Sequence, residues 1–112
     1  MTNEGGVSMI TKPKNLRIAF GFQRDDFGDI ELYEEQATVV KLIFALRLAG
    51  NSVKRIAECL TSFTIPTPTN NDIWEHKTLR KMLANSHYIG DDFYPQIIEK
   101  DVFLAVQGMK ST

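Results

Sequence analysis

The stretch FTIPTPTNND, residues 63–72, limits the fold more than any other segment of this chain. Its two prolines lack the backbone N–H that a helix or a central strand needs, and its asparagines and threonines favour turns. The stretch therefore ends the helix before it and forms a compact loop. Trp74 comes soon after this loop and is expected to anchor the start of the next helix.

Patterns typical of regular elements precede this loop. The segment EEQATVVKLIFALRLAG, residues 34–50, begins with acidic residues, continues with apolar ones and ends in a glycine, which predicts a helix. Ser52 is then suited to cap a short helix over residues 53–60, whose apolar residues share one face. Residues 17–33 alternate around an aspartate-rich turn at Gly28, which predicts a hairpin.

The block WEHKTLRKML, residues 74–83, gathers positive charge in a chain whose net charge is only −1. On a helix over residues 77–84 its side chains separate into two faces. Leu79, Met82 and Leu83 lie on one face, and Lys77, Arg80 and Lys81 lie on the opposite face. Such a basic face is typical of a helix that enters a DNA groove, but on the helix alone the pattern favours an ordinary solvated face.

The end of the chain predicts two further elements. Residues 87–98 alternate weakly and contain Gly90 and Pro95, which favours a small hairpin or wing. Residues 99–107 predict a closing helix that turns Val102, Phe103 and Val106 towards the core. One shared core is expected to bury the following residues: Ile43, Phe44, Ile56, Trp74, Leu79 and Leu83.

Composition and charge narrow the class of protein. A chain of 112 residues that is 43% hydrophobic can bury a single core. The single cysteine and the lack of a membrane-spanning run or signal pattern lead us to expect a cytoplasmic protein without a membrane partner. Residues 22–36 sum to a charge of −5 and residues 41–90 to +4, an asymmetry that can orient a protein on a polyanion.

No residue set predicts catalysis, a metal site or a cofactor. Cys59 can in principle pair with His76 or His87 as a nucleophile, but it stands among apolar residues, so a buried, unreactive thiol is favoured. The histidines lack the spacing of metal ligands. The aspartates of residues 25–29 lack the alternation of a calcium loop, and an ordinary turn is predicted.

Four segments follow one another in a specific order and spacing. They are FGFQRDDFGDIEL, VVKLIFALRLAGNSVKRIAECLTSFTIPTP, WEHKTLRKMLANSHYIG and QIIEKDVFLAVQ. In these segments the chain resembles the recombinase domain of large serine recombinases, over residues 16–107. The resemblance implies a DNA-binding domain that follows the catalytic domain of a recombinase, which integrates, excises or inverts phage and transposon DNA. The nucleophilic-serine segment of the family has no counterpart here, so we expect a non-catalytic fragment of a longer protein.

Patterns and resemblance together predict an α+β fold, mainly helical, with a helix-turn-helix-like or winged-helix-like arrangement and short β-hairpins. We expect residues 1–15 to be a flexible lead, residues 16–107 the domain and residues 108–112 a tail. Double-stranded DNA is the expected partner, contacted by Lys54, Arg55, His76, Lys77, Thr78, Arg80 and Lys81. The parent protein is expected to be a dimer on DNA and a tetramer in synapsis, and the isolated chain a monomer.

Within this set, Arg80 is the expected base contact, because a guanidinium can pair with guanine at two atoms, whereas the lysines are expected to hold phosphates. Three residues depart from the family pattern: Ala19 replaces a proline, Thr69 an arginine and Glu75 a capping serine or threonine. The last two changes weaken phosphate neutralisation. The alternatives are a protein-interaction domain whose basic face meets an acidic protein, and a hydrolase that depends on Cys59 or a histidine.

Overall fold

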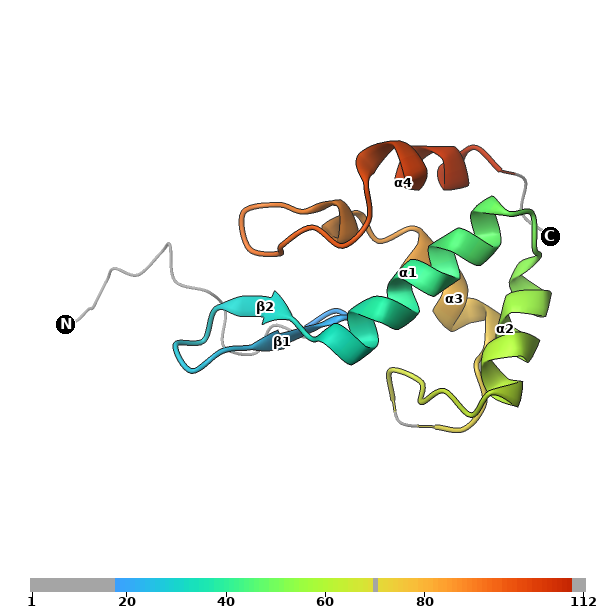
Figure 1. Cartoon of the computed structure of the whole chain (residues 1–112), viewed down its shortest axis with the longest axis horizontal. Coiled ribbons are helices and arrows are strands. Elements are labelled where there is room, and N and C mark those ends of the chain that lie inside the picture. Colours follow the sequence, from blue (N-terminus) through green and yellow to red (C-terminus); the bar gives the residue numbers. More distant parts are fainter. Residues whose placement is uncertain (1–17, 70, 110–112) are drawn as a thin grey trace.

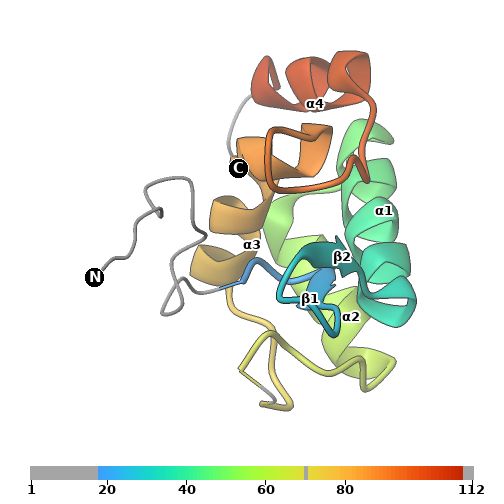
Figure 2. The same cartoon turned by 90° about the vertical axis from the view of Figure 1, so that its left-hand side faces the viewer.

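Helix α1 (Glu34–Leu48) is central in the computed structural model, which describes residues 18–69 and 71–109. The other elements are β1 (Phe22–Arg24), β2 (Ile30–Leu32), α2 (Val53–Ser62), α3 (His76–Leu83), a 3-10 turn η1 (Ser86–Ile89) and α4 (Lys100–Gln107). The hairpin projects from one end of the molecule and α2 closes the opposite end (Figure 1). Helix α3 lies along one outer side, with α1 on the other (Figure 2). The fold is α+β and mainly helical, as predicted.

The predicted hairpin forms, and its turn contains Gly28. The antiparallel register pairs Phe22 with Leu32, Gln23 with Glu31 and Arg24 with Ile30. Gly28 has a φ of +83°, a conformation that favours glycine. The Asp25 carboxylate accepts the backbone N–H groups of Phe27 and Asp29, each at 2.9 Å. These bonds are those of an aspartate turn, as predicted.

Helix α1 ends at the predicted glycine stop. Gly50 has a φ of +104° and donates its N–H to the Arg47 carbonyl at 2.9 Å, while Asn51 donates to the Leu46 carbonyl at 3.1 Å. This pair of bonds is a Schellman motif, which satisfies the last carbonyls of the helix. The Arg47 side chain is buried on the inner face of α1 and donates from Nη1 to the Asn51 carbonyl at 2.8 Å. The chain therefore reverses directly into α2.

Helix α2 begins as predicted and ends later than predicted. The Ser52 hydroxyl accepts the N–H of Arg55 at 3.1 Å and caps the helix. The helix extends past residue 60 to Ser62, because Thr64 takes the left-handed conformation, with a φ of 55°, and supplies the stop that glycine supplies after α1.

Residues 87–98 do not form the expected hairpin or wing. A 3-10 turn and a loop take their place, and none of the described residues in this span is in a strand. The Tyr88 carbonyl accepts two N–H groups from the end of the loop, at 2.8 and 2.9 Å, so the loop folds back onto η1. Pro95 has no N–H to give to a strand ladder, and the Asp91 carboxylate takes two of the neighbouring N–H groups. Local side-chain bonds thus replace strand pairing.

The predicted core is confirmed, since Ile43, Phe44, Ile56, Trp74, Leu79 and Leu83 are all buried. The predicted helix near the C-terminus also forms, with Phe103 and Val106 buried and Val102 half-buried. Tyr88 lies in the same core and donates its hydroxyl to the Phe20 carbonyl at 2.7 Å. Burial, and then the nearby Tyr94, raise the pKa of Tyr88 above its usual value. The core therefore holds the start of the hairpin against the helices.

Replacing Thr64 by glycine should stabilise the domain by roughly 0.5–1 kcal/mol, because a β-branched residue is strained at positive φ and glycine is not. Urea denaturation followed by Trp74 fluorescence measures the free energy of unfolding. Thr64→Ala is the matched control, since it removes the hydroxyl and keeps the strain of a Cβ atom. A midpoint for Thr64→Gly at or below that of the unchanged protein would contradict this description of the end of α2.

Candidate nucleic-acid interface

Trp74 fixes where α3 begins. Its indole is buried, with 3% of its surface exposed, and donates from Nε1 to the Ile65 carbonyl at 2.8 Å. Its backbone N–H donates to the Thr61 hydroxyl on α2 at 3.0 Å, and its ring packs edge-on against Phe20 at 5.9 Å between ring centroids. The loop after α2 is therefore tied at both ends. Helix α3 starts from this fixed point and packs against α2 and α1.

The two faces predicted for α3 are present. The helix spans His76–Leu83, against the prediction of residues 77–84, and buries Leu79, Met82 and Leu83. Lys77, Arg80 and Lys81 are exposed on the other face. His76 is exposed at the helix start and Thr78 is half-buried. The basic face, defined here as Lys77, Arg80 and Lys81, is thus available to a partner.

The cations of this region make no ion pair or side-chain hydrogen bond within the part of the chain that the structure describes. This holds for Lys54, Arg55, Lys77, Arg80 and Lys81. The first two are exposed on the N-terminal turn of α2. Arg80 and Val53 line one small cleft, which links the basic face to that turn. An ordinary solvated helix often pairs its charges along its own surface, whereas these five cations form no such pair within the described residues.

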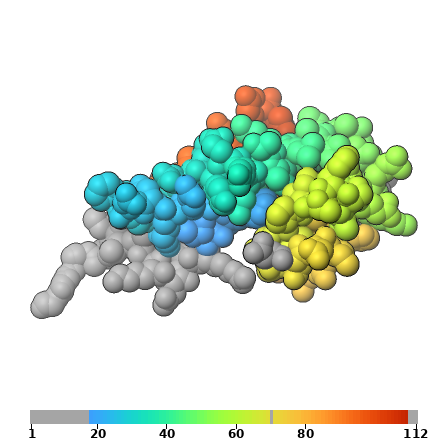
Figure 3. All heavy atoms as spheres, turned by 60° about the horizontal axis from the view of Figure 1, so that its bottom comes forward, coloured from blue at the N-terminus to red at the C-terminus, as the bar shows by residue number. Residues whose placement is uncertain are grey.

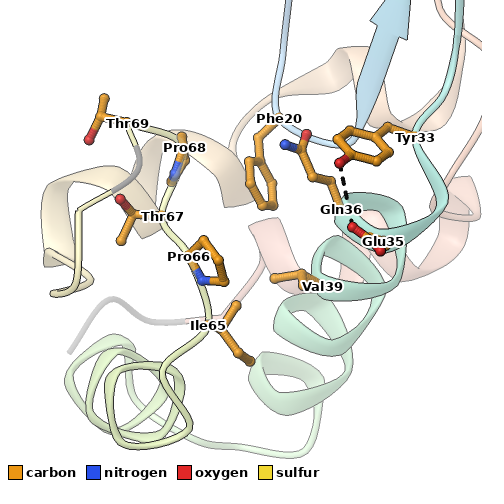
Figure 4. Close-up of a pocket in the computed structure, with 10 residues that line it drawn as sticks. All are labelled: Phe20, Tyr33, Glu35, Gln36, Val39, Ile65, Pro66, Thr67, Pro68 and Thr69. Carbon is orange, nitrogen blue, oxygen red and sulfur yellow. Dashed lines mark hydrogen bonds between the residues drawn. The ribbon is translucent and has the colours of Figure 1, made fainter.

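A groove of about 560 Å³ separates α1 from the loop after α2 (Figure 4). Phe20, Gln36 and Val39 form one wall, and Pro66, Thr67 and Pro68 lie across from them. An adjoining hollow of about 370 Å³ includes Thr78 of α3. In the space-filling view the loop joins α2 and α3 beside α1 (Figure 3). No sequence pattern predicts this groove, because its walls come from segments far apart in the chain.

The other candidate chemistries find little support in the described residues. No group of three histidine, cysteine, aspartate or glutamate residues could hold a metal ion there, and no helix there is long and apolar enough to cross a membrane. Cys59 is half-buried, which corrects the expectation of a buried thiol. Its position at the edge of the α2 apolar face, beside the buried stripe and not on it, explains the difference.

His87 pairs with a carboxylate, but no serine, threonine or cysteine side chain among the described residues bonds to its ring. Its Nδ1 lies 2.5 Å from Asp91 Oδ2, and its ring stacks on Tyr94. The pKa of Asp91 is lowered overall. Burial acts to raise this pKa, but hydrogen bonds from His87 and from the Phe93 and Tyr94 N–H groups, together with the charge of His87, outweigh that effect. This cluster closes the loop after η1, which is a structural role.

Comparison with known proteins agrees with this geometry. The structure matches a chain in the crystal structure of an LSR–DNA complex, with a TM-score of 0.65 and 20% identity over 87% of this chain and 32% of that one. It also matches a chain from a structural study of the sequence requirements of the Listeria innocua prophage attP site, with a TM-score of 0.65 and 20% identity over 88% of this chain and 43% of that one. The fold is thus that of a domain of large serine recombinases, and this chain spans less than half of the chains that it matches.

The Recombinase family model matches residues 34–112. Because this match extends over more than half of the chain, the chain belongs to the Recombinase family. The resemblance seen in the sequence is confirmed.

Replacing Glu75 by serine should stabilise the domain by about 1 kcal/mol. Glu75 occupies the N-cap position of α3 in an extended conformation and makes no side-chain bond to the helix, whereas a serine hydroxyl there can accept a free N–H of the first turn. Thermal unfolding followed by circular dichroism measures the change. Glu75→Ala removes the charge without adding a cap, so Glu75→Ser should be the more stable of the two. Equal stability of the two variants would show that α3 gains nothing from a cap.

Proposed function

We propose that this chain is the DNA-binding domain of a large serine recombinase and recognises attachment-site DNA during integration, excision or inversion of a mobile element. The observation that carries this proposal is the unpaired basic face of α3, held outward by a fully buried apolar face. The solved proteins of the same fold include one in complex with DNA. Such a protein is expected to act in the cytoplasm, where it meets that DNA.

In this proposal α3 is the recognition helix and lies in the major groove. Arg80 contacts a base edge, because its guanidinium can donate two parallel bonds to guanine. Lys77 and Lys81 neutralise phosphates on either side. His76 and Thr78 contact the DNA near the start of the helix. Lys54 and Arg55 hold a further phosphate from the exposed N-terminal turn of α2. The connection between α2 and α3 is longer than in a standard helix-turn-helix, and the Trp74 bonds give it the necessary rigidity.

Residues 16–107 form the binding domain in this proposal, with residues 1–15 as a lead and residues 108–112 as a tail. The parent recombinase binds DNA as a dimer and forms a tetramer in synapsis. The isolated chain is expected to be a monomer at the low concentrations of a binding assay.

The chain itself is proposed to be non-catalytic, with the nucleophilic serine in another domain of the parent protein. Among its serines, Ser52 accepts a helix-capping bond and Ser62 donates to the Cys59 carbonyl, which are local structural roles. Supercoiled plasmid that carries a bound site should therefore stay intact on incubation with the purified chain. Nicking that disappears on substitution of one serine would overturn this assignment.

Replacing Arg80 by alanine should weaken binding to a duplex selected from a random-sequence pool by about 1–3 kcal/mol and relax the preference at one base pair. Replacing Lys81 by alanine should weaken binding to all sequences alike and lower the slope of log K against log salt by roughly one. The two effects differ because only Arg80 is proposed to contact a base. Fluorescence anisotropy with matched and single-mismatch duplexes at several salt concentrations measures both.

Lys41→Ala is the matched control, because Lys41 is an exposed lysine on α1 outside the proposed interface. It should bind like the unchanged protein at moderate salt. If Arg80→Ala and Lys81→Ala also bind like the unchanged protein and keep their fold, the basic face is only a solvated surface. If the unchanged protein binds no duplex but binds an acidic protein through the basic face, the protein-interaction alternative is favoured.

A further inference from the structure

The tip of the hairpin carries an aromatic ring that the domain itself does not cover. The Phe27 side chain is 87% exposed, the most exposed of the large hydrophobic residues described. The Asp25 carboxylate bonds to the N–H groups on both sides of the ring, and the Gly28 N–H donates to the Asp25 carbonyl at 3.1 Å. The tip, residues 25–29, thus holds the ring away from the core, although apolar surface gains free energy when it is removed from water.

Nucleic acid is an unsuitable partner for this tip. Asp25 and Asp26 directly precede Phe27 in the sequence and Asp29 follows Gly28, and carboxylates and DNA phosphates repel one another. The loop with Asp91 and Asp92 projects from the same end of the molecule, away from α2 (Figures 1 and 2). A partner that fits the tip has an apolar hollow bordered by positive charge. A protein surface of this chemistry is what the tip can recognise.

The same chain has such a hollow at the other side of its helices. A cleft of about 150 Å³ is lined by Val53, Leu83, Val106 and Met109 together with the Arg47 and Arg80 side chains. The cleft lining holds no acidic side chain among the described residues. The cleft is open to solvent, so a side chain from another molecule can enter it without displacing a part of the domain. The width of the cleft suits a phenylalanine side chain, and the exposed Arg80 guanidinium at its rim suits the carboxylates next to Phe27 in the sequence.

We propose that the hairpin tip of one copy of this chain inserts Phe27 into the Arg47–Arg80 cleft of a second copy. The tip carboxylates then face the Arg80 guanidinium at the rim, while Arg47 keeps its bond to the Asn51 carbonyl. Tip and cleft are different surfaces, so the contact is head-to-tail and leaves one tip and one cleft available for further copies. A contact this small is weak, with a dissociation constant on the order of 1 mM, and the dilute chain stays a monomer.

The contact also has a consequence for DNA. Arg80 belongs both to the cleft and to the basic face, so a second copy and a DNA duplex compete for it. Only this competition rests on the proposed function, whereas the self-association does not depend on it. At concentrations where copies associate, the tip of a neighbouring copy therefore covers Arg80 until DNA displaces it.

Sedimentation equilibrium of the full chain tests the contact. Between roughly 0.05 and 1 mM, the average mass of the unchanged protein should rise steadily beyond a dimer, as open association requires. Phe27→Ala lacks the inserted ring and Arg80→Glu reverses the charge of the cleft, so each alone should stay a monomer. An equimolar mixture of these two variants should form a dimer and nothing larger, because one intact tip and one intact cleft remain. Phe63→Ala is the matched control, since Phe63 is 68% exposed at the end of α2 and should not affect association.

The outcomes separate this inference from the proposed function. A monomer at 1 mM for the unchanged protein, or association that Phe27→Ala leaves intact, overturns the head-to-tail contact. Phe27→Ala lies outside the basic face and should bind duplex DNA like the unchanged protein. Association that occurs as expected but is not displaced by any duplex counts against DNA binding at Arg80 and leaves the contact standing.

Discussion

The buried indole of Trp74 is the constraint on which the interface depends. Its two hydrogen bonds join the end of α2 to the loop and to the start of α3, and its ring reaches the segment that enters the hairpin. The proline-containing loop could not hold α3 in one orientation by backbone bonding alone, because its prolines have no N–H to give. The orientation of the basic face therefore depends on this enclosed side chain together with the buried apolar face of α3.

Basic and acidic side chains are concentrated on different parts of the domain. The basic face of α3 is unpaired and close to the basic turn of α2, whereas the hairpin tip and the loop after η1 collect aspartates at the opposite end. Phosphates are attracted to the first end and repelled from the second. The proposed DNA contact and the proposed protein contact therefore lie on separate parts of the domain.

Prediction from the sequence succeeded where a local pattern determines the structure. Helical spacing of apolar residues, Ser52 as a cap and Gly50 as a stop were enough to place α1, α2 and the two faces of α3. It failed for residues 87–98, where the Asp91 side chain bonds to the backbone and prevents strand pairing. The groove and the Arg47–Arg80 cleft were not predictable, since each joins residues from distant segments and only packing brings these together.

The most direct test of whether α3 contacts DNA is nuclear magnetic resonance. The ¹⁵N-labelled chain is titrated with a duplex selected for binding. The largest amide shifts should fall on His76–Leu83 and on the first turn of α2, because these backbone groups lie nearest the proposed phosphates and bases. The hairpin tip, residues 25–29, should shift little. Shifts that centre on the hairpin tip, with α3 unchanged at saturation, would contradict the assignment of α3 as the recognition helix.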